Sequence, residues 1–444
     1  MIYTAQRLPR HQGPAAWADI LGPGPGFPRL EEDITADVVV VGAGFAGISA
    51  ARRVLQIWPQ ARVVILDAWA VADGAAGRNS GFMIDLPHDL ASEDYAGTGD
   101  DQTLTRLNRH AIGFAREAVA EYDIPADFFD QAGKVNGAAT VAGEAHNRCY
   151  SKHLDGLNEP LEWLDAQAMA ELTGSTHYRS GLYTPGTVML QPAGYVRGFA
   201  TGLARVAQIF ERSPVLNFRP TGSDWVLRTP KGKVTTGRVI LAVNGHLESF
   251  GVAKGRLVQL FLFASMTAPL TEEQRSTLGG APRWGVTPSD PMGTTMRRID
   301  TGQGGHRIVT RNCAVVRPGM RPHDRDMRRA AAAHTRAFAT RFPALAGVAQ
   351  QHMWGGHLCL SLNGVAHARE IETGVYSACV QNGLGTARGT LTGIAAAERC
   401  CGQVSEITSY FDDEAELKRL PPQPFASLGA NAYLRWKEWR AGAE

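Results

Sequence analysis

The sequence predicts an α/β fold with two closely packed domains, and three observations lead to this prediction. The chain has 444 residues, which is too long for a single hydrophobic core. Near the N-terminus a glycine-rich turn separates a short β-branched run from a helical pattern, as in a βαβ unit. Between about residues 251 and 350 the pattern changes to alternating strands and turns, which indicates a second region built on an antiparallel sheet.

Composition narrows the class of protein. Hydrophobic residues make up 44% and charged residues 20% of the chain, so we expect an ordered globular protein. The net charge is +2 and the sequence has no dense basic stripe, so nucleic acid is not an expected partner. The six cysteines lack metal-like spacing, and no apolar run approaches the roughly 20 residues of a membrane span. We therefore expect a cytoplasmic protein without a metal site.

The first elements follow in chain order. Residues 1–35, rich in Pro and Gly, are expected to form an arm on the surface of a domain. A buried parallel strand is predicted at 37–41, then a helix at 48–57 and a second apolar strand at 62–66. The second strand ends at Asp67, which completes a βαβ unit within about thirty residues.

Later elements are predicted from the same two periodicities. Apolar residues recur at the helical period over 101–123 and 195–210, and an Arg/Ala-rich helix is expected at about 323–341. Buried strands are predicted at 237–243 and 375–380, and a last helix is expected to end near Cys401.

A dinucleotide site is predicted at the first βα turn. Gly42 to Gly47 form a GxGxxG motif between the first strand and its helix. The glycines permit a tight turn and a close approach of pyrophosphate, and the helix N-terminus offers free N–H groups. Asp67 lies twenty residues beyond Gly47, where a carboxylate accepts hydrogen bonds from ribose hydroxyls. An acid at this position disfavours a 2′-phosphate and hence NADP.

Three further segments favour FAD over NAD. A second glycine-rich loop, Gly74 to Gly81, begins seven residues after Asp67, where a long cofactor needs a second cradle. Ala242 to Gly245 close a strand, and the glycine turn from Asn382 to Thr386 leads into a helix whose N-terminus could stabilise negative charge on a reduced flavin. The predicted cofactor-binding residues are Gly42, Ala43, Gly44, Phe45, Ala46, Gly47, Asp67, Ala68, Gly77, Arg78, Asn79, Ser80, Gly81, Val215, Ala242, Asn244, Gly245, Asn382, Gly383, Leu384, Gly385 and Thr386.

This set of motifs resembles the D-amino-acid-oxidase-like flavoproteins, and within them the γ-glutamylputrescine oxidase-like enzymes. Those enzymes typically show GASGRNGG, which Gly74 to Gly81 matches with Ala76 for Ser and Ser80 for Gly. The resemblance extends over almost the whole chain, although only the glycine motifs are specific. Asp67 replaces the commoner Glu, and Phe82 to Asp85 depart from the relatives, which leaves the substrate open.

The resemblance implies a Rossmann-like FAD-binding domain interleaved with an α+β substrate domain. We expect an N-terminal arm at 1–35, an FAD-binding domain at 36–90, 187–250 and 352–405, a substrate domain at 91–186 and 251–351, and a tail at 406–444. The implied reaction oxidises the C–N bond of an amine or amino acid to an imine, with hydride transfer to flavin N5. The substrate would be a γ-glutamyl amine, an N-methyl amino acid or a similar compound. The alternatives are oxidation of a 2-hydroxy acid, a flavin-binding subunit of a hetero-oligomeric dehydrogenase, and a nucleotide-binding module without chemistry.

Candidate catalytic and substrate-binding residues are less specific. Asp85 and His88 follow the second glycine loop and could reach the substrate side of the flavin, or could form a polar turn. Trp354 could wall the pocket, and His357 could accept a proton or serve as a structural histidine. Met83, Arg297 and Arg311 are candidates for substrate binding, the arginines as carboxylate clamps or as solvated surface charges.

Attachment of the flavin and the electron acceptor stay open. Cys359 lies near the position of a flavin-linked cysteine in monomeric sarcosine oxidase, but a non-covalent FAD is expected, with Cys359 as a buried apolar side chain. Oxygen activation in those relatives depends on a lysine, and residues 255–350 contain none. The acceptor is therefore either O2 or a redox partner. The aromatic and basic tail from Tyr433 to Arg440 could contact a membrane or a partner subunit, but packing onto the protein's own surface is expected.

Overall fold

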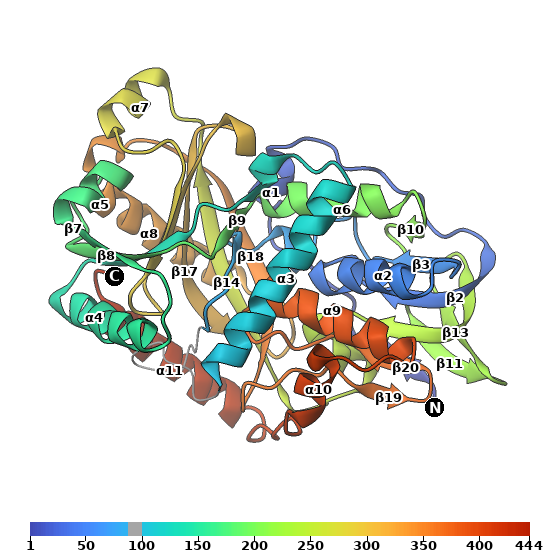
Figure 1. Cartoon of the computed structure of the whole chain (residues 1–444). Coiled ribbons are helices and arrows are strands. Elements are labelled where there is room, and N and C mark those ends of the chain that lie inside the picture. The colour runs from blue at the N-terminus through green and yellow to red at the C-terminus, as the bar shows by residue number, and fades with distance from the viewer. Residues whose placement is uncertain (88–99) are drawn as a thin grey trace.

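The computed structural model describes residues 1–87 and 100–444. Two large sheets lie side by side, each with its own helices (Figure 1). A third, small sheet of β4 (Phe82–Met83), β9 (Val188–Leu190) and β5 (Phe129–Asp130) lies along the chain segments that connect them. The mixed α/β class predicted from the sequence is confirmed.

The first sheet has nine strands, and its centre is parallel. β2 lies between β3 and β13, and residues Val38–Val41 pair with residues 63–66 on one side and 238–241 on the other. These short runs are buried on both faces, which explains their unbroken β-branched sequence. The strands are β1 (Tyr3–Thr4), β2 (Asp33–Val41), β3 (Val63–Leu66), β10 (Gln208–Phe210), β11 (Asn217–Thr221), β12 (Asp224–Arg228), β13 (Lys233–Leu241), β19 (Glu370–Glu372) and β20 (Val375–Ser377).

Helices α2 and α9 cross closely over this sheet. A Cβ on Gly393 of α9 would lie 2.2 Å from the backbone oxygen of Ala46 in α2, so only glycine permits this approach. The helices of this half are α1 (Ala16–Asp19), α2 (Phe45–Ile57), α3 (Asp101–Glu121), α6 (Pro192–Leu203), α9 (Ala387–Cys400) and α10 (Glu406–Asp413). The contact holds the start of α2, and hence the glycine turn, against the rest of the domain.

The second sheet has eight strands and buries both faces around β14. Phe261 and Phe263 pack toward α8, whereas Leu260 and Leu262 pack toward the C-terminal helix. The strands are β6 (Lys134–Ala138), β7 (Glu162–Asp165), β8 (Ser180–Thr184), β14 (Leu257–Thr267), β15 (Trp284–Pro288), β16 (Thr295–Ile299), β17 (Arg307–Val316) and β18 (Gln350–Ser361). The helices are α4 (Val141–Gly156), α5 (Ala166–Thr173), α7 (Glu272–Leu278), α8 (Asp324–Arg341) and α11 (Phe425–Ala441).

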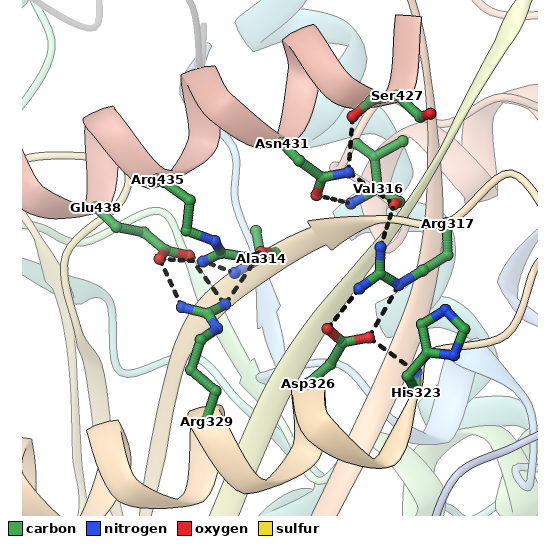
Figure 2. Close-up of polar contacts among 10 residues, drawn as sticks. All are labelled: Ala314, Val316, Arg317, His323, Asp326, Arg329, Ser427, Asn431, Arg435 and Glu438. Carbon is green, nitrogen blue, oxygen red and sulfur yellow. Dashed lines mark hydrogen bonds and ion pairs between the residues drawn. The ribbon is translucent and has the colours of Figure 1, made fainter. Parts of the chain in front are cut away.

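Helix α11 is attached to the edge of β17 by polar side chains (Figure 2). The pairing of β16 with β17 stops at Arg311, so the edge of β17 continues beyond its neighbour. The Asn431 amide accepts from the Val316 N–H at 3.0 Å and donates to the Val316 carbonyl at 3.1 Å, as a neighbouring strand would. The Ala314 N–H donates to Glu438 at 2.8 Å. The tail therefore packs onto the protein's own surface through polar side chains of α11, whereas Tyr433, Trp436 and Trp439 of the same helix stay exposed.

Most predicted elements are confirmed, with one correction. The helix predicted over 195–210 ends at Leu203, and Gln208–Phe210 instead forms β10, parallel to β3. Most residues of the predicted N-terminal arm are exposed or half-buried, while Trp17 and Leu30 anchor it in the cores of the first half, and the arm itself stays a prediction. The boundaries of the two domains stay a prediction.

Candidate active site

A cavity of about 590 Å³ lies between the two halves of the fold. One wall is built from the ends of the parallel strands and from the glycine loops. The opposite wall is built from side chains of β14, β17 and β18, the 287–292 turn and α11. Residues 7–11 of the N-terminal segment line it as well. The volume is in the usual range for a small-molecule or cofactor site.

The GxGxxG turn brings the start of α2 to the cavity. Gly44 precedes the first turn of the helix, so its unpaired N–H groups and the positive end of its dipole lie at this wall. Gly42 has φ +105°, and a Cβ on Gly47 would lie only 1.7 Å from the Gly42 carbonyl oxygen. Both positions therefore require glycine, and the resulting cradle suits an anionic diphosphate.

Asp67 lies at the end of β3 and lines the cavity. Its carboxylate accepts from the N–H groups of Ala43 and Trp69, both at 2.8 Å, which fixes the acid beside the glycine turn. Burial raises the pKa of Asp67 to about 6, and the nearby carboxylates of Glu211 and Asp73 act in the same direction. The remaining acceptor capacity of this carboxylate suits the hydroxyl groups of a ribose.

The second glycine loop is held by two arginines that donate to main-chain carbonyls. Arg78 lines the cavity, but its guanidinium donates to the carbonyls of Asp73, Gln12, Gly13 and Gly355. It therefore ties the loop to the N-terminal segment and to β18. The sequence placed it near the pyrophosphate or flavin, and the structure gives it this bracing position beside the cavity.

Arg297 supports the same loop from the other side. It is almost fully buried and donates to the carbonyls of Ser80, Gly81 and Leu190 and to the Gln303 amide oxygen. A Cβ on Gly81 would lie 2.0 Å from its guanidinium, so glycine is required there. Among the described residues Arg297 lies outside the cavity lining, so its placement does not suit the predicted carboxylate clamp.

Two asparagines brace the loops at the flavin end of the predicted site. The Asn244 amide oxygen accepts from the N–H groups of Val380 and Gln381 and from the Cys359 thiol. The Asn382 side chain accepts from the Ser361 N–H and donates to carbonyls of the 364–365 turn. Both asparagines have positive φ, near 46° and 51°, and each precedes a glycine. They fix the turns that bring Ala242 and residues 383–386 to the cavity.

Three histidines lie along the cavity wall. The His357 ring shares a 2.8 Å hydrogen bond with Gln259 through Nε2 and stacks on Phe261 at 4.9 Å. His246 packs edge-on to it at 5.4 Å, and His11 lies against Trp69 at 5.5 Å. Burial lowers the pKa of His357 and of His11 to about 3 and that of His246 to about 4, and the groups also repel one another's charge. These rings are therefore neutral at physiological pH.

The remaining predicted residues occupy different environments. Arg311 lines the cavity from β17. Trp354 is fully buried and donates from Nε1 to the Arg78 carbonyl at 3.0 Å, which places it beneath the glycine loop. Asp85 is buried and paired with Arg109 at 3.0 Å. Asp85, Trp354 and Met83 lie outside the lining formed by the described residues. His88 lies outside the described part of the chain.

Most of the predicted cofactor residues line the cavity, and the others support it. The lining residues are Gly42, Ala43, Gly44, Phe45, Ala46, Asp67, Ala68, Arg78, Asn79, Ser80, Val215, Ala242, Asn244, Gly383, Leu384, Gly385 and Thr386. Within the described chain, Gly47, Gly77, Gly81, Gly245 and Asn382 lie outside that lining. Cys359 is fully buried, and burial raises the pKa of its thiol well above the ordinary value. A non-covalent cofactor therefore stays a prediction.

Several cavity residues were not predicted from the sequence. Thr287 lines the opposite wall from β15, Asp290 and Met292 line it from the turn that follows, and Tyr433 and Lys437 line it from α11. The sheet segment from 255 to 350 contains no lysine, but the fold brings Lys437 to the same cavity. No local motif marks these residues, because only long-range packing brings them together. For Lys437, the one indication in the sequence was its place in the aromatic and basic tail from Tyr433 to Arg440.

The part of the chain that the structure describes holds neither a metal-binding cluster nor a membrane-spanning helix. In residues 1–87 and 100–444, no group of three or more His, Cys, Asp or Glu side chains is arranged to hold a metal ion. Across that same part of the chain, no helix is both long enough and apolar enough to cross a membrane.

Comparisons with known proteins agree with this geometry. The family model described as DAO, FAD dependent oxidoreductase, matches residues 37–399. The chain is 24% identical to a probable oxidoreductase OrdL of Rhizobium meliloti (strain 1021), over 86% of this chain and 87% of that protein. It is 24% identical to a gamma-glutamylputrescine oxidoreductase of Escherichia coli (strain K12), over 92% of this chain and 94% of that protein.

The fold is also similar to solved structures. The crystal structure of glycine oxidase from Geobacillus kaustophilus superposes with a TM-score of 0.69 at 16% sequence identity. The match covers 86% of this chain and all of that chain. At this identity the likeness concerns the fold. The glycine cradle, the acid after β3 and the second glycine loop are the residues that fit an FAD.

Proposed function

This chain belongs to the DAO family of FAD-dependent oxidoreductases, and from that premise we propose that it oxidises the C–N bond of an amine or amino acid to an imine. Bound FAD would supply the chemistry by accepting a hydride at N5 from the carbon beside nitrogen. The imine would then hydrolyse to a carbonyl compound and an amine or ammonia. A similar protein is named gamma-glutamylputrescine oxidoreductase, and the superposed structure is a glycine oxidase.

The composition of the wall opposite the glycine cradle carries the substrate proposal. This wall is largely apolar, with Leu260 and Leu262 among its residues, so it excludes water from the reacting carbon. It also presents two cations, Arg311 and Lys437, and one carboxylate, Asp290. Both signs of charge on one apolar wall suit a substrate that carries both a carboxylate and an amine. A γ-glutamyl amine or an N-methyl amino acid has this combination.

We assign binding roles accordingly. Arg311 offers paired donors to the substrate carboxylate, and Lys437 adds a point charge on the same wall. Asp290 favours the cationic or amine end, and its turn is fixed because one of its oxygens accepts from the Met292 N–H at 2.9 Å. Burial lowers the pKa of His246 to about 4 and that of His357 to about 3, so both rings stay neutral at the cavity wall and add no charge to it.

The first test is anaerobic reduction of the flavin absorbance. A panel would include γ-glutamyl amines, N-methyl amino acids, simple amino acids, amines without a carboxylate and 2-hydroxy acids. We expect bleaching with substrates that carry both charged groups. Bleaching by 2-hydroxy acids alone would contradict the proposal and favour alcohol oxidation on the same fold. Loss of all turnover on purification, with the flavin retained, would favour a subunit of a larger dehydrogenase.

Variants of the wall sharpen this test. Arg311→Met is expected to raise KM about 10- to 100-fold for a carboxylate-bearing amine, because a charge-assisted hydrogen-bond pair is worth about 1.5–3 kcal/mol. The same variant should leave KM for an amine without a carboxylate nearly unchanged. Arg328→Met, at an exposed position of α8, is the matched control. Equal KM changes for both kinds of amine would contradict carboxylate recognition. Air readmitted after bleaching would separate oxidase from dehydrogenase by the rate of colour return.

A further inference from the structure

Helix α11 turns its polar side toward the protein. Asn431, Arg435 and Glu438 point at the edge of β17, where their side chains bind the main chain of residues 314–316 (Figure 2). Leu434, on the same side, packs against the apolar cluster of the second sheet. The polar contacts of this side are therefore made within the chain.

The opposite side of α11 is apolar and faces solvent. At 100° per residue, one arc of the helix contains Phe425, Leu428, Gly429, Ala432, Tyr433, Trp436, Trp439 and Arg440. All of them are exposed, and the exposed fraction is 72% for Phe425 and 79% for Trp439. A helix on the surface of a soluble protein ordinarily has the reverse arrangement. A continuous exposed apolar arc of this kind marks an interaction surface.

The charges of α11 indicate which kind of partner this arc fits. The helix has three cations and one acid, and the acid, Glu438, is turned inward to Arg329 and Arg435. Arg440 accompanies the aromatic rings on the outer side, because its guanidinium lies 5.7 Å from the centre of the Trp436 ring. Lys437 lies at the border of the arc, where its Nζ is 5.7 Å from the same ring centre and the residue also lines the cavity. Exposed aromatic rings with flanking cations are typical of helices that lie in the interface of an anionic membrane.

Two other occupants fit less well. A second copy of the chain in a two-fold contact would bring the cations of both arcs to one interface, and the arc itself contributes no acid. A spanning helix does not fit either, because α11 has 17 residues and four charges.

We propose that the outer arc of α11 docks the protein flat on an anionic lipid surface. The helix is about 26 Å long at 1.5 Å per residue, so its five large apolar side chains contact the interface along one line. The inward contacts with β17 hold the arc in place before binding, which limits the entropy lost on docking. This proposal does not depend on the substrate.

The test is co-sedimentation of the full-length protein with vesicles. Vesicles of phosphatidylcholine and phosphatidylglycerol in equal parts would be compared with phosphatidylcholine alone, at low ionic strength and at about 0.5 M salt, where charges are screened. We expect binding to the anionic vesicles, with weaker binding at high salt and weaker binding to phosphatidylcholine. The double variant Trp436→Ser/Trp439→Ser should reduce the partition coefficient at least about tenfold, because two large aromatic side chains lose their burial.

Trp58→Ser is the matched control. Trp58 is an exposed tryptophan at the end of α2 that also lies under a guanidinium, that of Arg238 at 5.3 Å. The Trp58→Ser variant should bind vesicles as the unmodified protein does, and all variants should keep the same flavin spectrum. Absence of binding to anionic vesicles, or equal binding by the double variant, would overturn the proposal. The proposal would also be overturned if the unmodified protein formed concentration-dependent dimers that the double variant lost and the Trp58→Ser control kept. The occupant of the arc would then be a second copy of the chain.

Discussion

One wall of the cavity is lined mainly by main chain, and the facing wall is lined mainly by side chains. The wall around α2 is mostly main chain, with glycines at Gly42 and Gly47 where any Cβ would collide with a carbonyl group. The facing wall is made of side chains on a twisted antiparallel sheet and on α11. Substitutions cannot reshape a wall of main chain without disrupting its turns. In a wall of side chains, each substitution can change the size and charge of the cavity one residue at a time. The difference explains how one cradle serves many substrates.

The largest expected effect comes from adding a side chain to the main-chain wall. Gly47→Ala would place a Cβ 1.7 Å from the Gly42 carbonyl oxygen, so the turn must move away from the cofactor. We expect a colourless protein that does not take up FAD, as measured by its visible spectrum. Gly113→Ala, inside α3 with open space around its Cβ position, should retain FAD and gain up to about 1 kcal/mol of stability. A yellow Gly47→Ala protein would show that this wall tolerates movement.

A smaller effect is expected where a side chain supports the main-chain wall. Arg297→Met removes donors from three buried carbonyls behind the second glycine loop. We expect a loss of about 3–5 kcal/mol in the free energy of unfolding, because buried acceptors lose their partners. Urea unfolding measures this loss. Arg321→Met, at an exposed position, should stay within about 0.5 kcal/mol of the unmodified protein.

The histidines between the two walls give a pH dependence. The pKa of His246 is lowered to about 4 by burial and by Arg7, so its proton binds preferentially to the unfolded chain. Stability from this group is complete above about pH 6.5 and falls by about 1.4 kcal/mol per pH unit as the pH drops toward 4. His11 and His357 lie near His246, and their pKa values are lowered in the same direction. Glu248 is linked to this group of residues because its carboxylate accepts a hydrogen bond from the Gln259 side chain.

His246→Gln isolates this contribution. Urea unfolding of the FAD-free protein at pH 6.5 and pH 5 should show the unmodified protein losing about 2 kcal/mol more than the variant. Contributions from carboxylates are common to both proteins and cancel in the difference. Equal losses would mean that His246 is protonated in the folded state.

The smallest effect is expected at the outer support of the side-chain wall. Asn431→Ala removes the two hydrogen bonds to Val316 at the edge of β17. We expect a loss of about 1–2 kcal/mol in the free energy of unfolding and unchanged FAD content, since the main-chain wall is untouched. Ser427→Ala is the control, because the Ser427 hydroxyl donates only to the Pro424 carbonyl one turn earlier in the chain. Loss of FAD from Asn431→Ala would show that the two walls depend on each other.

The same contrast explains what could be predicted from the sequence. The main-chain wall was predicted from short segments, because a tight turn, a helix start and an acid twenty residues later are local consequences of residue type. Thr287, Tyr433 and Lys437 could not be predicted, because they reach the cavity from segments far apart in sequence. Arg297 was expected at the substrate and instead braces the glycine loop, since its charge alone does not say which partner it meets.

Two elements show the limits of periodicity. The apolar residues near Phe210 continue a helical spacing, but Gln208–Phe210 pair with β3 and become a strand at the sheet edge. Tertiary pairing overrides the local pattern there. Trp17 lies in a segment with many Pro and Gly residues, and it is buried because long-range packing places it in the core with its Nε1 donating to the Asn79 carbonyl, which no local pattern indicates.

The two Asn-Gly pairs on the cavity wall also bear on how the protein ages. Asn-Gly is the dipeptide most prone to deamidation, in which the glycine nitrogen attacks the asparagine side chain. Asn244 and Asn382 each hold several hydrogen bonds that this rotation would break. The reaction then requires local opening of the turn, which a bound cofactor opposes. Stored protein without FAD should therefore accumulate acidic forms on isoelectric focusing faster than the loaded protein.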